Sequence, residues 1–416
     1  MLKPTTEQLK FLDWEVGMFF HFGIRPFYHG HKDWDGLPMP PEGFNPTRLD
    51  CRQWLRTAKL IGAKYAILTT KHHDGFALWP SKYTGYSVAA SPWKEGKGDV
   101  VKEFTEACRA EGMGIGLYYS PAQWGSSAVS FDRPEEYDDY FINQITELLT
   151  GYGRIDYLWF DGCGSGGHKY DQKRIVAAIR ALQPGLLIFD MWDPDTRWVG
   201  NEDGYAPMVN LYEAEMNVVG ERKRVFAPAE CDCRLRESWF YDLNENTSKS
   251  VDELIGMYEM SVGRGSNLLL NIGPDDRGLI APGDYKRISE LGAEINRRYG
   301  TAHEFESVQK VQDNLYRVRL PEDRLSGIGK SDYLPLVRAA IIKEDVSEGQ
   351  SVREFKLYAY LPGLDPDKAG RVCVYHGGTI GHKAIARFPA LRTAGLELEI
   401  VSSEGTPRIT EIKVYG

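Results

Sequence analysis

Short apolar runs recur along residues 17–298, and most of them end in a polar or ionisable side chain. Longer amphipathic stretches separate the runs, a pattern typical of repeated strand–helix units around a parallel sheet. The segment MVNLYEAE from Met208 is the candidate for an eighth strand. The other expected strands are GMFFHFGI from Gly17, AKYAILTTKHH from Ala63, GIGLYYSP from Gly114, IDYLWFDG from Ile155, LLIFDM from Leu186, VFAPAEC from Val225 and NLLLNIG from Asn267.

The residues that end these runs distinguish between two folds that are both built on a parallel sheet. A doubly wound sheet would carry a glycine-rich phosphate turn after its first strand, and the sequence has none. A (β/α)8 barrel instead gathers the carboxyl ends of its strands into one active site. We therefore predict a TIM-like (β/α)8 catalytic barrel over residues 1–300. The polar residues expected at its rim are His21, His72, His73, Tyr119, Asp161, Glu230 and Asn271.

The pattern changes after Tyr299. Segments such as LYRVRL, EFKLYAYL and TEIKVYG alternate apolar and polar residues, with turn residues between them and no convincing helix. This alternation is typical of an antiparallel β-sandwich. We predict a C-terminal β-sandwich domain over residues 302–416, which either braces the barrel or binds sugar itself.

Charge and hydropathy narrow the range of partners. A formal net charge of -9 argues against nucleic acid, because that affinity depends largely on Lys and Arg. No run of roughly 18 apolar residues occurs, so we expect no membrane span. The N-terminal segment lacks the apolar core of a secretory signal, and the cysteines are scattered, so we predict a cytoplasmic protein. A neutral substrate fits these properties, and self-association into a homo-oligomer stays open.

Asp161 is the first candidate for chemistry. The two-residue period of a strand places Tyr157, Trp159 and Asp161 on one face. If that face is the barrel interior, Asp161 faces the active site. The alternative is an aspartate that starts a turn with Gly162.

A second carboxylate would complete the pair that glycoside hydrolysis needs. One carboxylate attacks or stabilises the sugar's anomeric centre, while a protonated partner releases the leaving oxygen. Glu230 ends the short run APAE and is one candidate. Spacing alone does not decide between it and the other acidic residues nearby, which are Glu202, Glu213, Glu215, Asp232 and Glu237.

Three histidines at strand ends allow two interpretations. His21, His72 and His73 could bind a metal together with a carboxylate, as in barrel hydrolases that activate water on zinc. Adjacent residues of a strand point to opposite faces, however, so His72 and His73 reach one ion only where the strand has bent. Neutral imidazoles can equally hydrogen-bond sugar hydroxyls, and we favour that reading. Trp79 and Trp239, which follow polar candidates closely, are the expected stacking platforms for a sugar ring.

Several of these runs together resemble a known family. GMFFHFGI, TTKHHDGFALWPS, GLYYSP, YLWFDG and GSNLLLNIGP occur in the order found in glycoside hydrolase family 29 α-L-fucosidases. The closing GGTIGHKAIARFP resembles the β-sandwich of bacterial members. The resemblance implies a (β/α)8 barrel, a retaining mechanism, no metal or other cofactor, and a fucosylated glycan as substrate.

The resemblance also implies roles for individual residues. The nucleophile falls on Asp161, and the acid/base falls on Glu230 through the PAECD segment. The residues implied to contact fucose or to form the pocket wall are His21, His72, His73, Tyr119, Trp239, Trp34 and Arg197. Two alternatives stay open: a metal-dependent barrel hydrolase, and a non-catalytic lectin-like protein that binds fucose.

Overall fold

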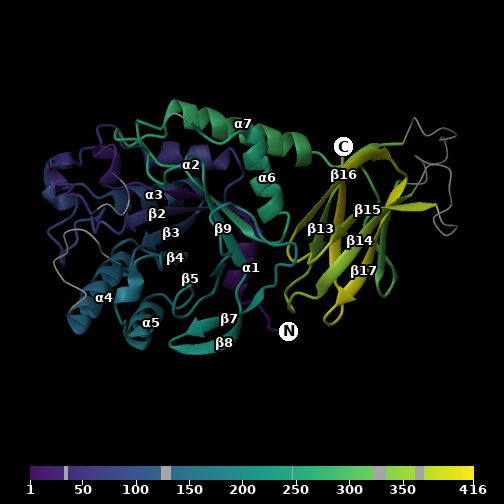
Figure 1. The fold of residues 1–416 in the computed structure, drawn as a ribbon, viewed down its shortest axis with the longest axis horizontal. Coiled ribbons are helices and arrows are strands. Elements are labelled where there is room, and N and C mark those ends of the chain that lie inside the picture. The colour runs from purple at the N-terminus through teal and green to yellow at the C-terminus, as the bar shows by residue number, and fades with distance from the viewer. Residues whose placement is uncertain (32–35, 123–132, 246, 322–333, 361–369) are drawn as a thin grey trace.

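The computed structural model describes residues 1–416 apart from 32–35, 123–132, 246, 322–333 and 361–369. Figure 1 shows two parts side by side, one of mixed helices and strands in purple to green and one of strands in green to yellow. Helix α7 (Pro282–Tyr299) runs along the first part toward the second. The predicted site residue Trp34 lies outside the described residues.

The first part is a nearly closed parallel barrel, as predicted. Its eight strands pair in the order β5-β4-β3-β2-β1-β10-β9-β6. A further parallel bridge between Phe189 and Thr196 brings the two edges of this sheet together. The strands are β1 (Val16–Phe20), β2 (Tyr65–Lys71), β3 (Gly114–Tyr119), β4 (Tyr157–Phe160), β5 (Leu187–Phe189), β6 (Arg197–Trp198), β9 (Ala229–Arg234) and β10 (Asn267–Asn271).

The eighth barrel strand differs from the prediction. It is the two-residue β6, whereas MVNLYEAE leads into β7 (Glu213–Val218), which pairs with β8 (Glu221–Phe226) as a separate antiparallel ribbon. Val219 and Gly220, both with positive φ, form the tight turn that such a hairpin needs. The predicted run VFAPAEC is divided between β8 and β9 at Pro228, which has no backbone N–H to donate.

Helices follow most of the barrel strands. Asp99 caps α3 by accepting a hydrogen bond from the Lys102 amide, and Gly112 ends that helix in the left-handed conformation. No helix in the described ranges combines the length and the apolar character that a membrane crossing requires. Besides α7, the α-helices are α1 (Thr6–Trp14), α2 (Cys51–Lys59), α3 (Val100–Glu111), α4 (Pro134–Gly151), α5 (Gln172–Leu182) and α6 (Val251–Ser261). Short 3-10 turns occur at η1 (Arg25–Phe27), η2 (Pro41–Gly43), η3 (Val88–Ala90), η4 (Trp93–Gly96) and η5 (Ser165–Gly167).

Strand alternation divides the barrel's apolar residues into two layers. One layer fills the barrel interior and is largely aromatic: Phe19, Tyr65, Tyr118, Tyr157, Trp159 and Phe189, with Leu187 and Leu269. The other layer packs between the strands and the helices, where Leu117 and Tyr119 of β3 lie with Phe104 of α3. Neighbouring residues of one strand therefore belong to different cores.

The second part consists of two antiparallel sheets, which confirms the predicted β-sandwich. Apolar side chains from both sheets, among them Leu357, Leu398, Ile342 and Val414, form a separate core. The five-stranded sheet contains β11 (Gln309–Gln312), β12 (Leu315–Arg319), β17 (Gly395–Ser403), β14 (Val352–Tyr360) and β15 (Arg371–Gly377). The three-stranded sheet contains β16 (Ala384–Arg392), β13 (Leu336–Glu344) and β18 (Ile409–Tyr415). The domain limits 1–300 and 302–416 stay a prediction.

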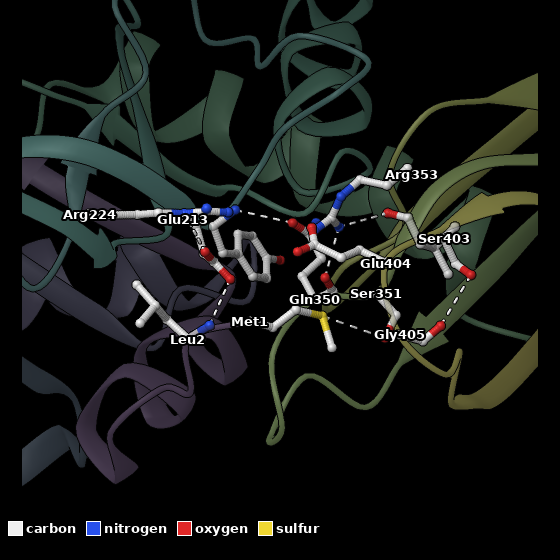
Figure 2. Close-up of polar contacts among 12 residues, drawn as sticks. Met1, Leu2, Glu213, Arg224, Gln350, Ser351, Arg353, Ser403, Glu404 and Gly405 are labelled. Atoms are coloured by element: carbon white, nitrogen blue, oxygen red, sulfur yellow. Dashed lines mark hydrogen bonds and ion pairs between the residues drawn. The ribbon is translucent and has the colours of Figure 1, made fainter.

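Polar contacts join the barrel to the sandwich. Lys383 Nζ lies 2.6 Å from Glu15 Oε2, and the Tyr212 amide donates to Gln350 Oε1. Figure 2 shows Glu213 and Arg224 of the β7–β8 ribbon close to the sandwich residues Gln350 and Glu404. Glu213 accepts hydrogen bonds from the Leu2 amide and pairs with Arg224, so the start of the chain is attached at this junction.

We expect Gly17→Ala to destabilise the barrel. A Cβ atom at Gly17 would lie 2.3 Å from Cζ of the fully buried Tyr65 ring, which leaves the added methyl no space. Overpacking of this kind costs about 1–3 kcal/mol, so the apparent melting temperature should fall. Gly256→Ala in α6 is the matched control, since a Cβ there meets nothing within 4 Å. Equal melting temperatures for the two variants would contradict the described packing.

Candidate active site

A cavity of about 580 Å³ opens where the barrel strands end. Its walls come from seven of the eight barrel strands or the residues that directly follow them, with further residues from loops. The lining residues are Phe19, His21, His72, His73, Tyr118, Trp159, Phe160, Asp161, Gly162, Cys163, Phe189, Asp190, Trp198, Glu202, Asp232, Arg234 and Trp239. The cavity therefore occupies the position where barrel enzymes place their active sites.

Asp161 directly follows β4 and receives three hydrogen-bond donors. Tyr118 Oη donates to Oδ2 at 2.8 Å, the Cys163 amide donates to Oδ1 at 2.8 Å, and His73 Nε2 lies 3.3 Å from Oδ2. Burial opposes ionisation, but the hydrogen bond and charge of His73, with the other donors, lower the pKa of Asp161 overall. An ionised, well-oriented carboxylate thus lies in the cavity.

His73 carries the opposite charge. Burial alone would lower its pKa, but Asp161 and the Cys163 side chain raise the pKa of His73 to about 9. Its Nδ1 lies 2.6 Å from Ser120 Oγ. We therefore assign His73 as an imidazolium at neutral pH that pairs with Asp161.

His21 and His72 are neutral. Burial lowers the pKa of His21 to about 3, and burial with the adjacent His73 lowers the pKa of His72 well below its usual value. Nδ1 of His21 lies 2.7 Å from Asn271 Oδ1, so we assign the ring proton to Nδ1. Nδ1 of His72 is buried without a hydrogen-bond partner among the described residues. With its proton on Nδ1, the His21 ring keeps Nε2 as an acceptor for a ligand's hydroxyl group.

Both His72 and His73 line the cavity although they are adjacent. Strand β2 ends at Lys71, and its register against β3 shifts between Thr69 and Lys71. The His72 carbonyl then accepts a turn hydrogen bond from the Gly75 amide. The chain has thus left the regular strand, which removes the alternation that would separate the two rings.

Aromatic rings form the apolar part of the cavity. Trp159 stacks on Phe189 with ring centroids 4.1 Å apart, and it also stacks on Tyr118 at 5.5 Å. Trp239 lies 4.8 Å from the His21 ring, in the cavity wall where the sequence places it. These faces suit the C–H surface of a sugar.

Besides Glu230, three predicted site residues lie outside the cavity. Tyr119 lies between the barrel and the helices, where its hydroxyl donates to Gln144 Oε1. Strand alternation turns Tyr119 outward and Tyr118 inward, so Tyr118 occupies the cavity position that was expected for Tyr119. Trp79 is buried and donates to Glu147, so it is not a stacking platform. Arg197 Nη2 donates to Asn210 Oδ1 and the Leu211 carbonyl, away from the cavity.

Glu230 lies beneath the cavity and is completely buried. Its carboxylate accepts hydrogen bonds from Tyr65, from Trp159 at 2.9 Å and from Tyr157 at 3.2 Å. Burial raises the pKa of Glu230 to about 7. An acid/base has to reach the leaving oxygen of a bound substrate, and a side chain enclosed by these three partners does not fit that role.

Three other acidic residues line the cavity. Asp190 accepts from the Trp198 amide, and Asp232 Oδ1 accepts from Trp198 Nε1 at 2.8 Å. Burial raises the pKa of Asp232 to about 8. The Glu202 side chain is 48% exposed and lies 3.9 Å from Arg234, so it is the acidic group at the solvent side. Sequence reasoning left Glu202 and Asp232 open as alternatives to Glu230, and it named neither Asp190 nor Arg234 as a candidate.

The three-histidine metal site, which the sequence left open as an alternative, takes a different form in the structure. The ligand atoms of His72, His73 and Asp161 lie within 4.8 Å of one another, and His21 does not belong to this group. Both ring nitrogens of His73 contact acceptors, and its raised pKa keeps both protonated. A protonated imidazole does not ligate a metal, so the group is better suited to hydrogen bonding.

Comparison with known proteins agrees with this geometry. The family model described as Alpha-L-fucosidase matches residues 39–299. The Arabidopsis thaliana protein named "Alpha-L-fucosidase 1" is 31% identical over 449 residues, which cover 99% of this chain and 87% of the plant protein. The chain belongs to the alpha-L-fucosidase family.

Other relatives of this family are similar over all or part of the chain. A crystal structure of a glycoside hydrolase 29 family member from an unknown rumen bacterium is 33% identical, with a TM-score of 0.86 and coverage of 99% of this chain and 77% of that one. The "Tissue alpha-L-fucosidase" of Mus musculus is 28% identical over 254 residues, 58% of this chain and 53% of the mouse protein. The predicted family and the enzyme class, a glycoside hydrolase, are confirmed. Because relatives come from plants, animals and bacteria, a bacterial origin stays a prediction.

We expect the His73–Asp161 pair to make the stability of this fucosidase family member depend on pH. The pKa of His73 in the folded state, about 9, exceeds its unfolded value of 6.5, so the stabilisation is fully present below pH 6.5 and is lost as pH rises through 9. The shift corresponds to about 3 kcal/mol. Urea unfolding between pH 6 and 10 should show the gap between wild type and His73→Gln narrowing with pH.

The exposed His376, which pairs with Glu354, provides the control for these unfolding measurements. His376→Gln should change the free energy of unfolding little at any pH, because exposed ion pairs contribute little. A gap for His73→Gln that stays constant with pH would mean that His73 is neutral in the folded protein.

Proposed function

We propose that the protein is a retaining, exo-acting α-L-fucosidase that removes terminal α-L-fucose from fucosylated oligosaccharides or glycoconjugates. The observation that carries the proposal is the ionised Asp161 in a cavity with two neutral histidines and aromatic walls. A family name alone does not determine substrate, because function depends on the site rather than the fold. The chemistry of this cavity fits the family's sugar.

The cavity matches the chemistry of fucose. Fucose is a neutral 6-deoxy sugar, so its site needs hydrogen-bonding groups for three hydroxyls and an apolar surface for the methyl group. Nε2 of His21 can accept from a hydroxyl, and the His72 and His73 rings line the same cavity. Trp159 and Trp239 offer the apolar surface.

Asp161 is the proposed nucleophile. Its carboxylate attacks the anomeric carbon, the bond to the leaving oxygen breaks, and a covalent glycosyl-enzyme forms. Tyr118 and the Cys163 amide orient the carboxylate, and His73 keeps it ionised in a buried place. Water then attacks the same carbon from the vacated side and releases fucose with its configuration retained.

Glu202 is the proposed acid/base in place of Glu230. It lines the cavity and is half-exposed, so it can reach a leaving group that points toward solvent, as exo action requires. In the first step it gives its proton to the departing oxygen, and in the second it takes a proton from water. Asp190 and Asp232 are less suited because Trp198 holds an oxygen of each.

Replacement of Asp161 by Ala should abolish turnover of an aryl α-L-fucoside. Loss of a nucleophile costs on the order of a thousandfold or more in kcat. Azide should restore part of the activity by attacking in place of the carboxylate, giving a fucosyl azide of inverted configuration that NMR identifies. Unchanged turnover in this variant would refute the assignment. If the wild-type protein binds fucose tightly but does not turn over the fucoside, the lectin-like alternative is favoured. If a metal chelator abolishes wild-type activity, the metal-dependent alternative is favoured.

Glu202→Gln should lower activity according to the leaving group. A general acid contributes about 100-fold or more when the leaving group is poor, and much less for an activated aryl fucoside. The matched control is Glu237→Gln, since Glu237 is exposed and outside the cavity lining. Steady-state rates on a natural-type disaccharide and on a nitrophenyl fucoside provide the comparison. Equal losses on both substrates would exclude Glu202.

A further inference from the structure

Glu230 connects three strands at the centre of the barrel. It lies on β9, while Tyr65 belongs to β2 and Tyr157 and Trp159 belong to β4. Tyr157 Oη also lies 2.7 Å from Thr196 Oγ1, beside β6. All of these side chains are buried, so each hydrogen bond forms away from water. The three donors and the carboxylate therefore fix one another's positions.

Of the three donors that the structure describes around Glu230, Trp159 is the one that also lines the cavity. Its indole N–H donates to Glu230 Oε1, which fixes one edge of the ring. The faces of the ring stack on Phe189 and on Tyr118. Tyr118 in turn donates to Asp161, so a chain of contacts runs from Glu230 through Trp159 and Tyr118 to the carboxylate of Asp161.

We propose that Glu230 is a positioning residue: by holding the Trp159 indole, it sets the orientation of the cavity floor and of the Tyr118 hydroxyl that orients Asp161. This inference rests on the proposed function of the same site. It gives Glu230 a role that needs no contact with substrate. It also explains a glutamate at a position where neither solvent nor ligand reaches it.

The chemistry of the partners supports positioning over proton transfer. An indole N–H only donates, and Glu230 is the acceptor that the described residues offer Trp159. Without the Glu230 carboxylate, the indole N–H and the Tyr65 hydroxyl would lose the acceptor they have in this buried place, whereas Tyr157 Oη could still donate to Thr196 Oγ1. The ring would then be free to tilt on Tyr118. A displacement of about 1 Å at a reacting group can cost 100-fold in rate.

The test compares four variants on one aryl α-L-fucoside. Glu230→Met and Trp159→Phe each remove the indole–carboxylate bond and should each lower kcat about 100-fold. Glu230→Gln keeps an acceptor for the indole and should stay within about fivefold of wild type, the effect of weakening one hydrogen bond. Tyr65→Phe is the matched control, because it removes a donor from the same carboxylate and leaves the Trp159 bond in place. It should also stay within about fivefold.

A double variant and a series of substrates with different leaving groups distinguish a positioning role of Glu230 from an acid/base role and from a purely structural role. Glu230→Met combined with Trp159→Phe should be no slower than either alone, since both act through one contact. Losses that multiply, or Tyr65→Phe as slow as Glu230→Met, would show that Glu230 does not act through Trp159. A loss in Glu230→Gln that grows with poorer leaving groups would make Glu230 the acid/base. If Glu230→Met does not fold, Glu230→Leu, which likewise offers the indole no acceptor, takes its place in each comparison.

A spectroscopic measurement separates this inference from the proposed function. Glu230→Met should change the tryptophan fluorescence spectrum, and the change should disappear in the Trp159→Phe background, with no substrate present. An unchanged spectrum would overturn the positioning role. Wild-type turnover of the fucoside tests only the proposed function, so the two can fail independently.

Discussion

The site depends on keeping one carboxylate ionised inside a buried cavity. Burial by itself raises the pKa of Asp161, because a charge in an apolar place is costly. The imidazolium of His73, the Tyr118 hydroxyl and the Cys163 amide offset that cost. Each of these groups comes from a different strand end or from the turn after β4, so the charge is stable only once the barrel has assembled.

The barrel interior beneath this charge contains polar contacts as well as apolar packing. Rings of Tyr65, Tyr157 and Trp159 direct their polar atoms toward Glu230, while their faces make the aromatic core. Such a network gives a more definite arrangement than apolar packing alone, because a hydrogen bond depends on both the distance and the direction between its two groups. The floor of the cavity is the upper surface of this network, which links the stability of the barrel to the geometry of the site.

Much of the architecture could be predicted from local patterns. Seven barrel strands and the sandwich follow from alternating or continuous apolar runs, and the inward face of β4 follows from its two-residue period. The same period separates Tyr118 from Tyr119 in β3, but only the pairing of Tyr118 with Trp159 of β4 shows which of them faces inward. The eighth strand could not be predicted, because two residues carry no pattern. The shared location of His72 and His73 also needed the structure, since it results from the irregular end of β2.

The sequence by itself determined the chemical inventory: a barrel whose strands end in histidines and acidic residues, and an aspartate after an apolar strand. Only the tertiary structure decided which acidic residue reaches the cavity. Glu230 and Glu202 are alike as residues, yet one is enclosed by three donors and the other is half-exposed beside Arg234. The physical reason is that the pKa and reach of a carboxyl group depend on burial and partners, and residues far apart in the chain supply both.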